Sequence, residues 1–112
     1  MPDELPGLGR FAAPSLAILL ALGDGPQHGY AIMIAARRLT GEPLGPGTLY
    51  ATLSRLEARG LIEALPAEDR RRPYRLTGDG VAMLRAQLEG IEGIVREGLA
   101  RVGRSEDSGS TA

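Results

Sequence analysis

Apolar residues recur with helical spacing in four segments of the chain, and glycine and proline separate these segments. Residues 15–22 follow Pro14 and are apolar on every face, which predicts a first helix buried on more than one side. A second helix is expected over about residues 27–39, because its apolar positions follow a period of 3.6 residues. Glycine and proline clusters at 23–26 and 41–43 bound this second helix.

The third segment predicts the best-defined helix. Gly45 and Pro46 suit its N-cap and first position, and Gly60 suits the left-handed residue that ends it. One face is a stripe of leucines, and the opposite face carries only small, polar or basic side chains: Thr48, Ala51, Thr52, Arg55 and Arg59, with Tyr50 and Ser54 on its flank. Such a helix can pack on one side and enter a DNA major groove with the other.

Two short strands are expected next, at 61–65 and 71–76, with a turn at 66–69. Pro73 marks the returning strand as an edge strand, because proline cannot donate to the ladder. Arg70, Arg71 and Arg72 then lie at or near the tip of a β-ribbon. Guanidinium groups suit DNA phosphates or the minor groove, because they bind phosphate bidentately and stay charged.

The last segment predicts one amphipathic helix over 77–103, with Thr77 as its N-cap and Gly80 where a capping box would have glutamate. Its apolar residues step by three and four in a heptad seam: Val81, Leu84, Leu88, Ile91 and Val95. No later segment covers this seam. We therefore expect a dimerisation helix, joined in the interface by residues of the first helix: Leu16, Leu19 and Leu20.

These elements divide the chain into four parts. We expect a flexible arm (1–12), a winged helix-turn-helix DNA-binding domain (13–76), a dimerisation helix (77–103) and a disordered tail (104–112). The predicted fold class is mostly α, with a small two-stranded β-wing.

Composition narrows the classes of function. The 112 residues include one histidine, no cysteine and no clustered carboxylates, which leaves no catalytic triad, thiol nucleophile, metal site or cofactor site and argues against an enzyme. The start lacks the basic and apolar regions of a signal peptide, and the longest apolar run is too short for a membrane span. We expect a cytoplasmic protein with no membrane partner. The net charge of the chain is −1. The segment from Arg37 to Arg75, however, contains eight arginines and only five acidic residues, so it is locally positive.

Three linked motifs resemble those of PadR-family transcriptional regulators. The stretch His28-Gly29-Tyr30-Ala31-Ile32 resembles the motif that opens the family's second helix. The family's recognition-helix signature is similar to a second stretch, which consists of Gly47-Thr48-Leu49-Tyr50, Leu53, Arg55-Leu56-Glu57 and Gly60-Leu61-Ile62. The family's wing and last helix resemble Arg70-Arg71-Arg72 followed by Tyr74-Arg75-Leu76-Thr77 and Gly80. The resemblance covers residues 16–84 and implies a homodimeric repressor that leaves a pseudo-palindromic operator on binding an effector. The single last helix resembles the shorter subfamily.

Two functional hypotheses follow. The first is a sequence-specific transcriptional regulator, a homodimeric repressor of double-stranded operator DNA released by a small-molecule effector. Its DNA-contacting residues would be His28, Tyr30, Thr48, Tyr50, Ala51, Ser54, Arg55, Arg70, Arg71, Arg72 and Tyr74. The second is a winged-helix dimer that acts as a protein-interaction or ligand-binding module without binding DNA.

Single residues also allow two interpretations each. His28 suits a phosphate contact or a pH-sensitive effector switch, and equally a capping or packing role. Tyr30 and Tyr50 suit phosphate donors or half-buried packing residues, and Arg55 suits a DNA contact or a surface ion pair.

Overall fold

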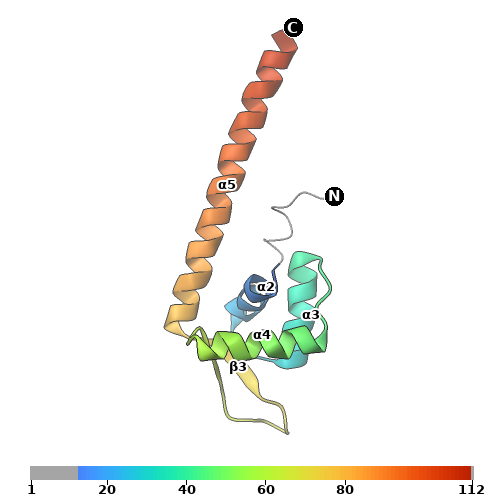
Figure 1. Cartoon of the computed structure of the whole chain (residues 1–112), viewed down its shortest axis with the longest axis vertical. Coiled ribbons are helices and arrows are strands. Elements are labelled where there is room, and N and C mark those ends of the chain that lie inside the picture. Colours follow the sequence, from blue (N-terminus) through green and yellow to red (C-terminus); the bar gives the residue numbers. More distant parts are fainter. Residues whose placement is uncertain (1–12, 112) are drawn as a thin grey trace.

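The computed structural model describes residues 13–111, and the side chains of residues 13–107. Within this part, helices α2 (Pro14–Ala21), α3 (Gly29–Thr40) and α4 (Pro46–Ala58) form a compact head, with a short 3-10 turn η1 (Leu22–Asp24) after α2. Helix α5 (Gly78–Thr111) leaves the head and projects far beyond it (Figure 1). The architecture is a winged helix-turn-helix with a long C-terminal helix. The expected arm, 1–12, lies outside the described residues.

The sheet has three strands, β1 (Gln27–His28), β2 (Ile62–Ala64) and β3 (Pro73–Leu76), in the antiparallel order β1-β3-β2. Gln27 and His28 pair with Tyr74 and Pro73, so α3 begins at Gly29 instead of Gln27. The predicted two-stranded wing is confirmed as β2 and β3, and β1 adds a third strand to the sheet that the sequence did not predict. The prediction that Pro73 marks an edge strand is wrong, because β3 is central. Pro73 fits there as the first residue of the strand, and its carbonyl still accepts from the Leu65 amide at 2.8 Å.

Helix α2 lies at the centre of the core. Its side chains are buried on several faces, as the all-round apolar pattern predicts, and they pack against α3, α4 and α5. Leu16 and Leu19 are only 5% and 1% exposed within the single chain. This corrects the expectation that they line a dimer interface, because the core of the chain itself already covers them. Leu20 is half-buried. Leu84, which the sequence predicts in the dimer seam, is 8% exposed and belongs to the same core, so the expectation for it is corrected for the same reason.

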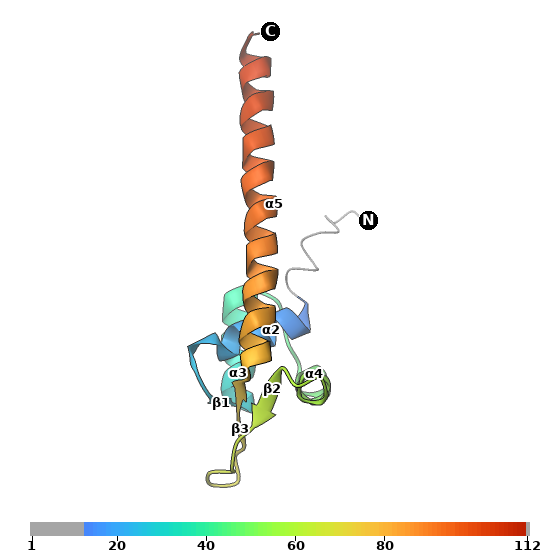
Figure 2. The same cartoon turned by 90° about the vertical axis from the view of Figure 1, so that its left-hand side faces the viewer.

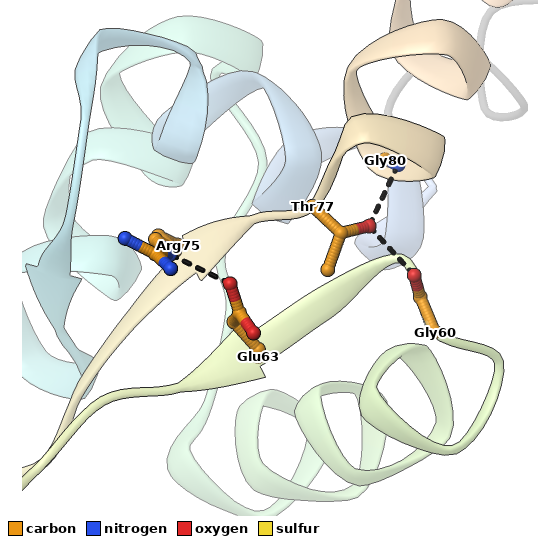
Figure 3. A network of polar contacts seen from close by, with 5 residues as sticks. All are labelled: Gly60, Glu63, Arg75, Thr77 and Gly80. Atoms are coloured by element: carbon orange, nitrogen blue, oxygen red, sulfur yellow. Dashed lines mark hydrogen bonds and ion pairs between the residues drawn. The ribbon is translucent and has the colours of Figure 1, made fainter.

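A small polar junction joins the end of α4, the base of the wing and the start of α5 (Figure 3). The Thr77 hydroxyl donates to the Gly60 carbonyl oxygen at 2.6 Å and accepts from the Gly80 amide at 3.0 Å. The Thr77 amide donates to the Leu61 carbonyl oxygen at 3.1 Å. These contacts confirm Thr77 as the N-cap and Gly60, with φ +75°, as the left-handed terminator of α4. Across the neighbouring strands, the Arg75 guanidinium binds the Glu63 carboxylate at 2.7 Å.

The close approach of α5 to the junction explains why the capping box stays incomplete. A Cβ atom at position 80 would lie 1.9 Å from the Leu61 carbonyl oxygen, which is a backbone atom that cannot turn aside. Only glycine fits, so the glutamate of a full capping box is excluded on steric grounds.

Helix α5 is longer than expected. The sequence predicts its end at residue 103 and a disordered tail over 104–112, but the helix continues to Thr111. Glu97 forms an ion pair one turn away with Arg101 at 2.6 Å, and its carboxylate also lies 3.8 Å from Arg104, two turns away and beyond residue 103. Once a helix exists, each further residue adds a hydrogen bond without a new nucleation cost. At 34 residues the helix is ~51 Å long, and Figure 2 shows it pointing away from the wing.

Replacing Gly80 by alanine should lower the free energy of unfolding by about 1–3 kcal/mol, because the new methyl group forces α5 away from the Leu61 carbonyl. Urea denaturation followed by circular dichroism measures the change. Gly78→Ala is the matched control, since a Cβ at position 78 meets no atom within 4 Å. Equal stability of the two variants would contradict the close approach.

Candidate nucleic-acid interface

The outward face of α4 carries few bulky side chains. Thr48, Ala51, Ser54 and Arg55 are exposed on it, while Leu49, Leu53 and Leu56 are buried underneath. This face presents short side chains and one arginine, a surface that a major groove of DNA can accommodate.

Thr52 corrects the sequence prediction for this face. It is fully buried, with 0% exposure, although the sequence predicts it on the outward side. The reason is its spacing: Thr52 follows Leu49 by three residues and precedes Leu56 by four, so it lies on the buried stripe. Its hydroxyl accepts a hydrogen bond from Arg55 Nη2 at 3.3 Å, so a buried side chain holds one end of an exposed guanidinium.

The wing turns at its tip through Asp69 and Arg70, in a turn over 68–71 that lies two residues later than the turn expected at 66–69. Glu68 and Arg71 pair on either side, with backbone hydrogen bonds of 2.6 and 2.8 Å. Asp69 and Arg70 have φ of 49° and 68°, as the two central residues of a type I′ hairpin turn require. Because neither residue is glycine, the sequence lacks the usual signal for this turn. Arg70 consequently lies at the extreme tip, with Arg71 and Arg72 exposed beside it.

A groove of about 930 Å³ separates the wing from the start of α3. Sequence-predicted site residues from three separate segments line it: His28 and Tyr30 at the start of α3, Tyr50 on α4, and Arg70, Arg71, Arg72 and Tyr74 on the wing. Gly29 and Glu68 line it as well. The structure therefore gathers these predicted residues around one groove, and it places Thr48, Ala51, Ser54 and Arg55 on the outward face of α4 beside it.

His28 contacts the wing across this groove. Its Nε2 lies 3.6 Å from Glu68 Oε1, which forms an ion pair when the imidazole is protonated. His28 occupies the N-cap position of α3, but its side chain makes no capping hydrogen bond. Its Nδ1 is buried without a hydrogen-bond partner in the described part of the chain. The His28 side chain therefore does not cap α3.

Gly29 is the residue of this groove that sequence reasoning missed. A Cβ atom at position 29 would lie 2.7 Å from Tyr50 Oη and 3.2 Å from Cε1 and Cζ of the same ring. The Tyr50 ring therefore lies directly against the start of α3. The motif around Gly29 marks the segment, but no pattern within one segment reports a contact between two helices.

Tyr74 forms part of the groove and also packs against the hydrophobic core. Burial raises the pKa of its hydroxyl above the ordinary 10.0, and the Glu57 carboxylate raises it further, while Arg72 opposes the rise. The hydroxyl therefore stays protonated and able to donate at neutral pH.

The profile of the transcriptional regulator PadR-like family matches residues 18–86, more than half of the chain. The chain belongs to this PadR-like family. The matched residues include α3, α4, the wing and the junction at Thr77, so the match covers the interface described above.

Two sequence relatives extend this assignment. The PadR-like chain is 39% identical to the transcriptional regulator Rv3488 of Mycobacterium tuberculosis over 102 residues, 88% of this chain and 92% of the relative. It is 46% identical over 76 residues, 68% of its length, to an uncharacterised 37.1 kDa protein in transposon TN4556 of Streptomyces fradiae. The chain spans 22% of the length of that Streptomyces protein.

Solved structures share the fold. A transcriptional regulator from Clostridium thermocellum superposes with a TM-score of 0.67 at 26% identity, covering 85% of this PadR-like chain and 93% of that chain. Bacillus subtilis PadR in complex with operator DNA superposes with a TM-score of 0.59 at 25% identity, covering 66% and 45% of the two chains. The PadR-like fold is thus that of DNA-binding transcriptional regulators.

The described residues form neither a metal cluster nor a membrane span. Among them, no three histidine, cysteine, aspartate or glutamate side chains gather where they could hold a metal ion. None of the described helices combines the length and the apolar character that crossing a bilayer requires.

Because the folded state raises the pKa of Tyr74, it disfavours the tyrosinate. The stabilisation from neutral Tyr74 is complete below pH 10.0 and is lost as the pH rises through the folded-state pKa. The wild-type free energy of unfolding should therefore fall more steeply above pH 10.0 than that of Tyr74→Phe. Urea denaturation of both proteins below and above this pH checks the difference, and parallel losses would contradict it.

Proposed function

We propose that this protein is a homodimeric transcriptional repressor that binds pseudo-palindromic operator DNA and leaves it when a small-molecule effector binds. The observation that carries the proposal is the continuity of one surface. The exposed face of α4 passes through Tyr50 into the groove that the wing arginines line. A helix for the major groove and a cationic wing for the backbone thus adjoin one another.

The base-reading part of the interface is assigned to α4. Thr48, Ala51, Ser54 and Arg55 are exposed along it and would face the base edges, with Arg55 suited to the acceptors of guanine. The match to Bacillus subtilis PadR, a protein captured with operator DNA, supports this assignment.

The backbone-contacting part is assigned to the groove. His28 and Tyr30 at the N-terminal end of α3 and the wing arginines would hold phosphates on either side of it. The Tyr74 hydroxyl, which also lines the groove, would donate a hydrogen bond to a phosphate oxygen. The arginines carry the sequence-independent share of affinity, because each neutralised phosphate releases counterions.

The dimer is assigned to α5. Val81, Leu88 and Val95 are exposed along the predicted seam, and Ile91 is half-buried. A groove of about 500 Å³ follows the lower part of the seam, where Arg85, Glu89 and Glu92 border it. Leu99 and Val102 extend the apolar stripe toward the end of the helix, at 68% and 54% exposure. A second copy of α5 would cover this stripe, and an effector that favours another spacing of the two α4 helices would release the DNA.

The first test is fluorescence anisotropy of wild-type protein with duplexes from the gene's own upstream region and with scrambled duplexes. We expect tight binding to one upstream segment and a steep loss of affinity as the salt concentration rises. Absence of binding at low salt would overturn the proposal and favour the second hypothesis, a winged-helix interaction module, which the net charge of −1 would suit.

Replacing Arg71 and Arg72 together by alanine should weaken binding to upstream and scrambled duplexes alike. It should also reduce the slope of log affinity against log salt by roughly 0.9 for each phosphate that the variant no longer neutralises. The control is the double alanine variant of Arg96 and Arg101, which removes the same charge from α5. An unchanged slope for the wing variant would remove the wing from the DNA interface.

Replacing Leu88 and Val95 together by aspartate should convert a dimer into a folded monomer, because both side chains are exposed within one protomer. Analytical ultracentrifugation gives the mass, and circular dichroism checks that the helices remain. Aspartate at Ala86 and Ala100, exposed on another face of α5, is the control and should remain dimeric. A monomeric wild type would contradict the assignment of the seam.

A further inference from the structure

We propose that Gly29 is a positioning residue of the DNA interface. Because it has no side chain, the Tyr50 ring can lie against the start of α3 and present its hydroxyl to a DNA phosphate in the groove. This inference rests on the proposed DNA binding and deepens it, since it adds a residue that does not itself touch DNA.

The backbone conformation at position 29 does not require glycine. Gly29 is the first residue of α3 and has no positive φ, unlike Gly25, Gly41 and Gly60. Glycine is the weakest helix former after proline, so alanine would suit this position better by local propensity. A glycine that opposes local propensity without a conformational need indicates a steric requirement from elsewhere in the fold.

The steric requirement at position 29 comes from Tyr50. The three atoms nearest to a Cβ at this position are all in the Tyr50 side chain: Oη at 2.7 Å, with Cε1 and Cζ at 3.2 Å. The hydroxyl oxygen is inside the closest approach that real Cβ atoms make, whereas the ring carbons lie only slightly closer than usual. A side chain at position 29 would therefore displace the hydroxyl first.

The Tyr50 hydroxyl is available to bind a ligand in the groove. Tyr50 is 52% exposed, and its hydroxyl makes no hydrogen bond to any described residue. It lines the same groove as Arg70, Arg71 and Arg72, where an anion is electrostatically favoured. A ring that lies against α3 and carries a donor into a groove lined by three arginines suits a phosphate oxygen, because the donor and the positive charges then bind the same anion.

The test is a double-mutant cycle on affinity for the upstream duplex, using Gly29→Ala, Tyr50→Phe and the two combined. Each single variant should lose about ten-fold in affinity, the size of a hydrogen bond to a charged group. The double variant should bind no more weakly than Tyr50→Phe alone, because phenylalanine lacks the oxygen that the new methyl group displaces. The salt slope should not change, because a neutral hydroxyl releases no counterion.

Two further measurements separate positioning from a general loss of folding. Thermal unfolding of each variant checks that the winged domain stays folded at the assay temperature. Gly78→Ala, a change at the start of another helix with open space around it, is the control and should bind like wild type.

The outcomes separate this inference from the proposed function. If wild type binds the upstream duplex but the two single losses multiply in the double variant, Gly29 acts independently of Tyr50, and the inference is overturned while the DNA-binding proposal stands. Unchanged affinity of Gly29→Ala would overturn it equally. Failure of the wild-type protein to bind any duplex would overturn the proposed function, and this inference with it.

Discussion

The packing of α5 against the Leu61 carbonyl fixes where the long helix joins the wing and the end of α4. That carbonyl accepts from the Thr77 amide, and the Thr77 hydroxyl bridges Gly60 and Gly80 at the same point. The end of α4, the base of the wing and the first turn of α5 thus share one set of short polar contacts (Figure 3). Because backbone atoms form most of this junction, its geometry allows little adjustment.

The junction has a consequence for regulation. Helix α5 carries the exposed apolar seam, and α4 carries the exposed polar face. The Thr77 contacts connect the start of α5 to the end of α4. In the proposed dimer, a change in the direction of the first turn of α5 would therefore move α4 or break the contacts at Thr77. An effector bound near the seam would act on DNA affinity through this connection, provided that it binds the two dimer arrangements with different affinity.

Two residues that border the groove have a conformation or a residue type that local backbone preferences disfavour. Arg70 adopts a positive φ at the tip, where glycine or asparagine would be less strained, and Gly29 begins a helix that alanine would stabilise more. Both residues border the same groove as Tyr50 and the other wing arginines. Local strain and weak propensity at a charged groove are consistent with selection for recognition in addition to stability.

The sequence alone determined the elements whose signals are local. Proline and glycine at 45–46 and 60 bound α4, Thr77 caps α5, and the order of helices and strands predicts the winged helix-turn-helix, because each signal acts within a few residues. It also identified half of the residues that line the groove. Only the tertiary structure decided the rest. Strand β1 exists because two residues pair with β3 almost fifty positions away, and no pattern within two residues can report this. The burial of Thr52 depends on which elements pack against α4. Helix α5 continues beyond residue 103, where the composition of the sequence suggested a disordered tail. The contact between Gly29 and Tyr50 joins two helices, so it follows from their relative placement and from neither helix by itself.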